Sequence, residues 1–375
     1  MKGFLYFGRL EKEKGFDAIL GMLRMFLHNG ELPFSLFIFG AGSYENELLE
    51  LANESKNIHF FGWKKLPEIQ RYVENCEYCL MPSTFLETFG LTALTAISRG
   101  LPVIGYKKGG LVPFIEEDHN LENYEGICTD EKLFNCVSEL LTAKKKTTKP
   151  TISLEKYSKE NWITTIYPLL GKHKKILLVS DFINKVGGIE TYIHDVKELL
   201  ESHGYEVKIR GRELPKGWKG TVKKLFGIGW GAFNFIDAFR LWRFCKKWQP
   251  DIIWYNSTLR RLGRMSVWVG GFFAKERWMM YHDFGYFFPF PKKLLYEQQI
   301  KTPLTFFSFL SMAKQRAITT SIFVVGKFIS LNLLKRKLST IDKHLVPSPF
   351  LVDILHKSHQ ISKNKIFCLE HFLQK

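Results

Sequence analysis

The sequence has little of what marks secreted or membrane-spanning proteins. It holds six cysteines in 375 residues, scattered among apolar neighbours, which argues against a disulfide framework and for reduced core thiols. No run of 18 uncharged apolar residues occurs, which argues against a spanning helix. The first apolar run is short and leads straight into charge, so we expect no signal peptide. These absences predict a soluble, cytoplasmic, globular protein.

Metal-binding patterns are equally scarce. The sequence contains no Asp-x-Asp pair. Cys76 and Cys79 form a lone CxxC without a second cysteine pair or a nearby histidine cluster. We therefore expect neither a zinc site nor a redox site there, and no metal or cofactor elsewhere.

Negative charge is scarce in the second part of the chain. Residues 1–170 carry a net charge of −3, whereas residues 171–375 carry +20, which gives the total of +17. The length suffices for two domains, and so large an asymmetry predicts that they have different partners. The basic half calls for an anionic one: a membrane surface, a phosphorylated acceptor or nucleic acid.

One stretch, residues 79–110, combines two buried strands with a helix that follows a glycine. The apolar run 79–81 ends at a proline, and apolar residues from Leu91 onward recur at helical spacing. A strand that leads into a helix with free backbone N–H groups is an anion site, and Gly90 lets a ligand approach that backbone. A carboxylate would repel phosphate, so we expect Glu87 to accept hydrogen bonds from sugar hydroxyls.

Two cations and a glycine pair follow the first strands of the chain. Residues 3–9 have the pattern of a buried strand that ends at Arg9, and Lys14 follows five residues later. At the edge of a parallel sheet, Arg9 would bind a phosphate through two hydrogen bonds and Lys14 would act as a point charge. Residues 34–39 form another strand that runs into Gly40 and Gly42, a turn that is weak evidence alone. Two solvated surface cations are the alternative interpretation of Arg9 and Lys14.

Together these motifs resemble the signature of retaining nucleotide-sugar glycosyltransferases with the GT-B fold, the glycosyltransferase family four type. The residues that carry the resemblance are Gly8-Arg9-Leu10, Lys14-Gly15, Pro82-Ser83, Glu87, Phe89-Gly90-Leu91 and Gly100-Leu101-Pro102-Val103-Ile104. The resemblance implies an α/β protein of two Rossmann-like domains that face a cleft. It also implies transfer of a hexose with retention and without a metal.

The resemblance assigns roles to residues of the first domain. Arg9 and Lys14 match the family's diphosphate pair, and Glu87 matches the carboxylate that orients the donor sugar. The donor-binding residues it implies are Gly8, Gly40, Gly42, Phe89, Gly90, Leu91 and Thr95, with Gly187 and Gly188 from the other domain. Thr95 departs from the pattern, because the family usually has a second glutamate eight residues after the first. A threonine can bond a ribose hydroxyl only without charge assistance, so donor affinity and identity stay open.

The order of the domains is unusual for this family, whose donor-binding domain is C-terminal. Here the donor motifs come first, and residues 153–170 resemble the family's closing helix. The turn at Gly187-Gly188 then resembles the opening loop of the acceptor-side domain. We expect a donor domain at 1–150, a crossover helix and joint at 151–172, and a basic acceptor domain at 173–375. A circular permutation explains this order; two adjoining halves of tandem transferases, or a fragment of a longer chain, are the alternatives.

Candidate acceptor-side residues lie in the basic half. His282 and Asp283 follow a strand and resemble the family's HD turn, where the histidine would contact the acceptor or the transferred sugar. A lone histidine at a strand end is more often structural. Arg260, Arg261 and Arg264 follow another strand end and are candidates for holding an acceptor phosphate.

Residues 216–248 are rich in tryptophan, phenylalanine and lysine and allow two interpretations. One is a helix at a membrane interface, with aromatic rings at headgroup depth and lysines on anionic lipid. The other is a helix packed between a sheet and solvent.

The sequence thus predicts a metal-independent retaining glycosyltransferase that moves a hexose from a nucleotide-diphosphate sugar to a glycan or lipid-linked acceptor in cell-surface polysaccharide synthesis. The expected partners are that donor and acceptor and, at the inner face of the plasma membrane, an anionic lipid surface. Nucleic acid is less favoured. The alternative is a non-catalytic protein of the same fold that binds anionic lipid or nucleic acid through its basic half.

Overall fold

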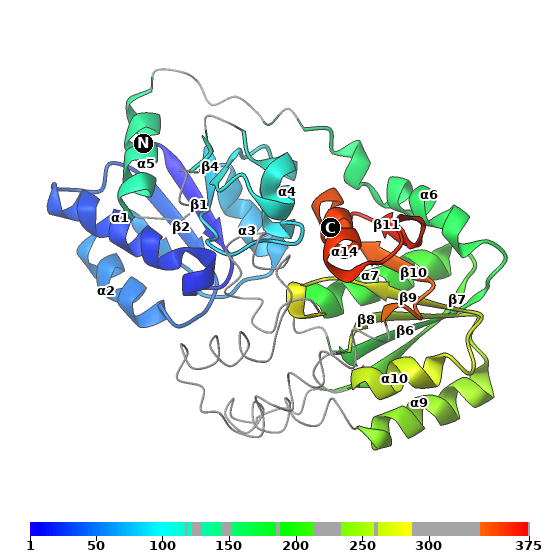
Figure 1. Ribbon diagram of the computed structural model, residues 1–375. Coiled ribbons are helices and arrows are strands. Elements are labelled where there is room, and N and C mark those ends of the chain that lie inside the picture. Colours follow the sequence, from blue (N-terminus) through cyan, green and yellow to red (C-terminus); the bar gives the residue numbers. More distant parts are fainter. Residues whose placement is uncertain are drawn as a thin grey trace. The chain divides into compact units, whose positions relative to one another are not determined.

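The structure is a computed structural model that describes residues 1–116, 119–121, 130–143, 150, 152–184, 188–213, 234–258, 262–286 and 338–373. These residues form two compact units, one built mainly from Met1–Lys156 and the other from residues between Tyr157 and Phe372. Each unit contains one parallel sheet with helices on both of its faces (Figure 1).

The sheet of the first unit has five strands in the order β3-β2-β1-β4-β5, all parallel. Its strands are β1 (Gly3–Phe7), β2 (Ser35–Phe39), β3 (Ile58–Phe60), β4 (Tyr78–Met81) and β5 (Val103–Gly105). Its helices are α1 (Phe16–His28), α2 (Glu45–Glu54), α3 (Leu66–Val73), α4 (Leu91–Ser98) and α5 (Asp130–Thr142), with short 3₁₀ turns η1 (Lys12–Lys14) and η2 (Gly109–Phe114). The chain reverses direction across the sheet at β1, and doubly wound folds bind ligands at the strand ends beside such a reversal.

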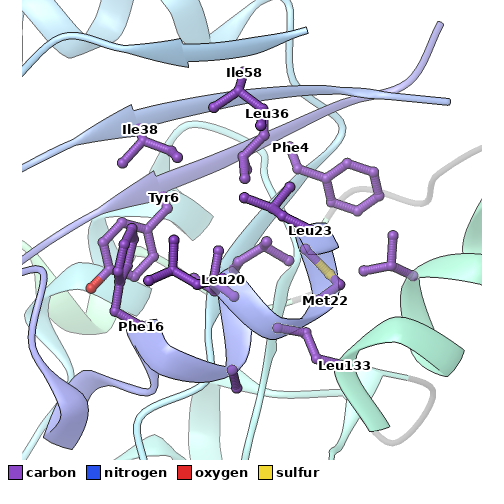
Figure 2. Packing of buried hydrophobic residues seen from close by; sticks show 14 of the residues in the cluster. Phe4, Tyr6, Phe16, Leu20, Met22, Leu23, Leu36, Ile38, Ile58 and Leu133 are labelled. Atoms are coloured by element: carbon purple, nitrogen blue, oxygen red, sulfur yellow. The ribbon is translucent and has the colours of Figure 1, made fainter. Parts of the chain in front are cut away.

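Alternate residues of these strands point to opposite faces of the sheet and explain the two helical layers. Phe4, Tyr6, Leu36 and Ile38 share one core with the apolar faces of α1, α2 and α5 (Figure 2). On the other face, the ring of Phe37 lies against Tyr72 of α3. A parallel sheet covered on both faces needs strands that are apolar throughout, and these strands are.

The sheet of the second unit has six parallel strands in the order β11-β10-β9-β8-β6-β7. Its strands are β6 (Lys175–Phe182), β7 (Glu206–Arg212), β8 (Ile252–Ser257), β9 (Glu276–Met280), β10 (Lys343–Val346) and β11 (Ile366–Cys368). Its helices are α6 (Lys159–Leu170), α7 (Gly188–Ser202), α9 (Phe235–Trp248), α10 (Gly263–Gly270) and α14 (Pro349–His359), with 3₁₀ turns η4 (Glu155–Tyr157), η6 (Phe284–Tyr286) and η8 (Lys363–Lys365).

The two faces of this second sheet are also covered differently. One face packs against α6 and α7, where Trp162 and Tyr192 join Trp254 and Trp278 of the sheet in a single core. On the opposite face, the Tyr255 hydroxyl donates a hydrogen bond to a carbonyl of α10, and α9 lies beside α10 (Figure 1). Helix α6 therefore packs with the second unit.

The two-sheet α/β class predicted from the sequence is confirmed, and the boundaries show one clear error. The amphipathic helix expected over 153–170 begins at Lys159, because the Ser158 hydroxyl caps it by accepting the Asn161 amide at 3.0 Å. The domain limits drawn at 150 and 172 stay predictions.

The cysteines found in the described residues are free thiols, as the sequence predicts. Cys76, Cys79 and Cys245 are buried, and burial raises the pKa of Cys76 to about 12. Within these same residues, no helix is both long and apolar enough to cross a lipid bilayer.

Candidate functional site

The loops after β1, β2 and β4 meet at the carboxyl edge of the first sheet because glycines let their backbones touch. A Cβ on Gly40 would lie 1.8 Å from the Gly8 carbonyl oxygen, and one on Gly42 would lie 2.3 Å from that of Leu10. The space at Gly15 is equally restricted, since a Cβ added there would lie 1.8 Å from the Pro82 carbonyl oxygen. The predicted glycines Gly8, Gly40 and Gly42 thus lie together, and they act as backbone contacts.

An ion pair occupies the centre of this edge. The Lys14 ammonium lies 2.7 Å from Oε1 of Glu87, and both side chains are largely buried, with exposures of 20% and 12%. The Ser83 hydroxyl donates to the same carboxylate oxygen at 3.0 Å. The Lys14 ammonium also lies 4.7 Å from the centre of the Phe85 ring. A cation and a carboxylate that the sequence assigned to diphosphate and sugar are therefore brought together.

Arg9 extends outward from the same edge. Its guanidinium pairs with Glu13 at 2.8 Å, and its side chain is 46% exposed. The Tyr6 hydroxyl donates to the Arg9 carbonyl at 2.6 Å, which fixes the backbone at the end of β1. The Arg9 guanidinium can exchange Glu13 for a phosphate with little loss of free energy, since exposed ion pairs contribute about 0–1 kcal/mol to stability.

Helix α4 begins at Leu91, four residues after Glu87. Its N-cap is Gly90 with φ 99°, which has no side chain to cap the first amides. The Phe89 side chain is buried against Phe114, so this residue serves packing while the amides that follow it carry the anion-binding character. The Thr95 hydroxyl donates to the Leu91 carbonyl at 2.8 Å, one turn earlier in the helix.

A third cation at this edge was missed by the sequence reasoning. The Lys108 ammonium donates to the Thr84 carbonyl at 2.9 Å and lies 5.0 Å from the centre of the Tyr106 ring. The signal was present, because Lys108 follows β5 just as Arg9 follows β1. The Glu87 carbonyl also accepts the Gly110 amide at 2.8 Å, which ties the loop after β5 to the loop after β4.

In the second unit, His282 and Asp283 follow β9. The His282 Nε2–H donates to Oδ1 of Asn256 at 3.1 Å, since that oxygen can only accept. Its ring stacks on His371 with 5.5 Å between centres, and the ring of Tyr192 meets it edge-on. Asp283 accepts the Gly285 amide at 2.7 Å, the hydrogen bond of a tight turn. The structure thus gives His282 structural contacts, and its part in catalysis stays a prediction.

The other predicted residues of this unit are only partly described. Gly188 is exposed and begins α7, whereas Gly187, Arg260 and Arg261 lie outside the described residues. Arg264 belongs to α10, with its side chain outside the description.

Lowering the pH from 7 to 5 should destabilise the second unit. Burial, with the neighbouring His371, holds the pKa of His282 well below its usual range, and burial lowers the pKa of His371 to about 3. Below about pH 6.5 the unfolded chain takes up protons that the folded unit refuses, so stability is complete above that pH and falls below it. Each histidine should cost up to about 1.4 kcal/mol per pH unit.

Urea unfolding followed by tryptophan fluorescence measures this loss, because eight of the nine tryptophans follow residue 156. The His371→Gln variant should lose about half of the pH dependence that the two histidines produce. The exposed His203 provides a control, and His203→Gln should keep the full dependence. A free energy of unfolding that is constant between pH 7 and 5 would show that these histidines do not titrate as expected.

Helix α9 carries an exposed apolar face, which bears on the two interpretations of residues 216–248. Ala238, Leu241, Cys245 and Trp248 pack inward, so the helix does lie between sheet and solvent. Its outer side nevertheless exposes Phe235, Ile236 and Phe239, beside exposed Trp268 and Phe272 near α10. Residues 216–233 lie outside the described residues.

Comparison with known proteins finds similarity in the first part of the chain. Residues 2–149 match the family model described as "Glycosyl transferases group 1". An uncharacterized 41.2 kDa protein in the cps region of Klebsiella pneumoniae is 30% identical over 114 residues, 30% of this chain and 30% of that protein. The glycogen synthase of Mycobacterium tuberculosis is 34% identical over 111 residues, 28% of this chain and 26% of that enzyme. The chain thus spans about 30% of the length of these curated relatives.

A solved structure with partial similarity is the pneumococcal O-GlcNAc transferase GtfA in complex with UDP and GlcNAc. It is 26% identical with a TM-score of 0.31, over 37% of this chain and 28% of that chain.

Proposed function

We propose that this chain is a retaining glycosyltransferase, because residues 2–149 match the family model described as "Glycosyl transferases group 1". It would move a hexose from a nucleotide-diphosphate sugar to a glycan or lipid-linked acceptor of a cell-surface polysaccharide. The first unit would bind the donor and the second the acceptor, an order that a circular permutation explains. The Klebsiella relative is named for its place in a cps region, which supports this class of acceptor.

The observation that carries the proposal is the Lys14–Glu87 pair, 2.7 Å apart at the carboxyl edge of the sheet. Departure of a nucleoside diphosphate leaves negative charge on the phosphate that bound the sugar. Lys14, Arg9 and the first amides of α4 would stabilise that charge, and a half-buried cation does so more strongly than an exposed one. Glu87, released from Lys14, would accept hydrogen bonds from the sugar.

Retention would follow without a protein nucleophile if the acceptor attacked from the face that the diphosphate leaves. The departing phosphate oxygen would then take the proton of the attacking hydroxyl. We include metal independence in the proposal because the sequence holds no Asp-x-Asp pair, so side chains and amides would supply the positive charge.

A second candidate is a non-catalytic protein of the same fold that binds anionic lipid. The exposed Phe235, Ile236 and Phe239 at the start of α9 favour it, because the same helix also exposes Lys246 and Lys247 in its last turn. The same face would also suit an enzyme that works on a lipid-linked acceptor, so the two candidates differ in donor binding.

A thermal-shift screen against UDP-, GDP- and ADP-sugars tests the proposal. One donor class should raise the melting temperature, since a ligand at 100 times its dissociation constant raises the free energy of unfolding by about 2.7 kcal/mol. The same donor should then be consumed in a transfer or hydrolysis assay. The Lys14→Ala variant should lose most of the shift, whereas Arg24→Ala, which removes an exposed cation paired with Glu47, should keep it.

No shift and no turnover with any donor, together with sedimentation on anionic vesicles, would favour the lipid-binding candidate. Binding to nucleic acid with a steep salt dependence and no donor binding would also contradict the proposal.

A further inference from the structure

A cavity of about 340 Å³ lies at the carboxyl end of β7, wholly within the second unit. Its described lining comes from β6, β7, α9 and the residue before α10, and Figure 1 labels these elements. Its lining residues are Val179, Arg210, Gly211, Arg212, Asp237, Arg240, Leu241, Phe244 and Leu262. Three arginines therefore line a cavity that the sequence reasoning did not single out.

Asp237 fixes the position of two of these arginines. Its side chain is only 4% exposed, and both of its carboxylate oxygens lie 2.8 Å from Nε of Arg212. Nη1 of Arg240 lies 3.4 Å from one of these oxygens. Asn234 supports the carboxylate by donating from its side-chain amide at 2.6 Å. Because Arg212 is held through Nε, its two terminal nitrogens remain available to a ligand.

Arg210 is held in a different way. The central carbon of its guanidinium lies 3.8 Å from the centre of the Phe244 ring, a stacking distance that keeps the charged plane over α9. It forms no ion pair with any acidic residue that the structure describes. Its side-chain Nη1 donates to the Ile209 carbonyl at 3.2 Å. Among the described lining residues, Arg210 is thus the arginine without a carboxylate partner.

Charge and shape together indicate the ligand. Among the described lining residues, three guanidinium groups accompany one carboxylate, which leaves two net positive charges. The backbone forms the floor, since a Cβ on Gly211 would lie 2.1 Å from the Ser180 carbonyl oxygen. Val179, Leu241 and Leu262 supply apolar wall. A phosphate monoester, close to doubly charged at neutral pH, neutralises this lining, whereas a carboxylate compensates half of it.

We propose that this cavity binds a phosphate monoester carried by the acceptor, held by Arg210 and by the terminal nitrogens of Arg212, with Asp237 as a positioning residue. As a statement about the acceptor it rests on the proposed transferase function. Binding of the phosphate group itself does not depend on the first unit. The ligand's phosphate would lie against the arginines and its uncharged part against the apolar wall.

Calorimetric titration of the full chain tests this inference, with UDP, GDP or ADP at saturation to occupy the donor site, whichever the thermal-shift screen selects. Glucose 6-phosphate should bind, while glucose should not and glucuronate should bind at least tenfold more weakly. The Arg210→Ala variant should weaken glucose 6-phosphate at least tenfold, and Arg210→Lys should recover part of the loss. Arg210 suits this test because it is exposed and holds no ion pair, so its removal should leave the melting temperature unchanged.

Arg243 provides the control, because it is an exposed arginine of α9, the helix beside the cavity, and is absent from the described lining. Arg243→Ala should bind glucose 6-phosphate as the unaltered protein does. Equal binding by Arg210→Ala and Arg243→Ala, or no binding of glucose 6-phosphate at millimolar concentration, would overturn the proposal. Glucuronate bound as tightly as glucose 6-phosphate would overturn the assignment to a phosphate monoester.

The source of the phosphate can be separated in the same experiments. A lipid headgroup would be identified if the protein sediments more with phosphatidic acid vesicles than with phosphatidylcholine vesicles. That extra sedimentation should be lost in Arg210→Ala and in the presence of glucose 6-phosphate. Binding of glucose 6-phosphate without such sedimentation would identify a soluble or glycan-borne phosphate. Arg210→Ala should leave binding of the nucleotide-sugar donor unchanged, so failure of this inference is distinguishable from failure of the donor site.

Discussion

The Arg9→Ala variant is expected to turn over its nucleotide-sugar donor about 100- to 1000-fold more slowly, the usual cost of removing one preorganised group that stabilises a developing anion. The Arg9 side chain is 46% exposed, and its ion pair with Glu13 is a surface pair, so its loss should barely change stability. The slower turnover should therefore come from weaker stabilisation of the departing diphosphate. Steady-state rates of donor consumption, measured with and without acceptor, give the loss in kcat.

Arg24→Ala is the control for this experiment. Arg24 is 52% exposed and pairs with Glu47, so its removal deletes a similar charge and a similar ion pair from the same unit. It lies on α1 and should leave turnover unchanged. Arg9→Lys keeps the charge without the planar fork and should fall between the two. Full turnover by Arg9→Ala would show that the diphosphate does not leave against this residue.

The Gly15→Ala variant is expected to lower the free energy of unfolding of the first unit by about 3 kcal/mol or more. Gly15 has φ 69°, and the added Cβ would lie 1.8 Å from the Pro82 carbonyl oxygen. The backbone of residue 15 sets the position of the Cβ, and the oxygen belongs to the backbone of Pro82, so no side-chain rotation can relieve the contact. Hydrogen exchange of peptides from β1 and α1, compared with the unaltered protein, measures the loss.

The Gly100→Ala variant separates the cost of a positive φ from the cost of a steric clash. Gly100 has φ 83°, close to that of Gly15, but a Cβ there would meet nothing within 4 Å. Its replacement should cost only the conformational penalty of about 1 kcal/mol. A Gly15→Ala protein no less stable than Gly100→Ala would mean that the loop after β1 can move away from Pro82. In that case Lys14 would not be fixed against Glu87.

Much of the fold could be predicted because strands and helices have local signals. The apolar runs at 34–39 and 79–81 became β2 and β4, and the helical spacing after Gly90 became α4. The start of α6 was placed too early because apolar periodicity continues through residues that a cap excludes from the helix. Only the contact between Ser158 and the Asn161 amide marks where it begins.

The site was predictable in part for the same reason. Residues at the ends of parallel strands share one edge whatever their spacing, so Arg9, Gly40 and Glu87 could be assigned to it together. Lys108 was missed although it also follows a strand. The arginines chosen from the sequence were Arg260, Arg261 and Arg264, whereas those that line the cavity of the second unit are others.

By itself, the sequence determined the two α/β units, the order in which they occur and the candidate donor edge, because apolar alternation, helical period and glycine turns are properties of neighbouring residues. Only the tertiary structure decided that Lys14 meets Glu87, 73 residues away, and that Asp237 gathers Arg212 and Arg240 beside Arg210. These contacts depend on which strands are neighbours in the sheet and on how closely the backbones approach. Neither the strand order nor the backbone distance can be read from residue spacing along the chain.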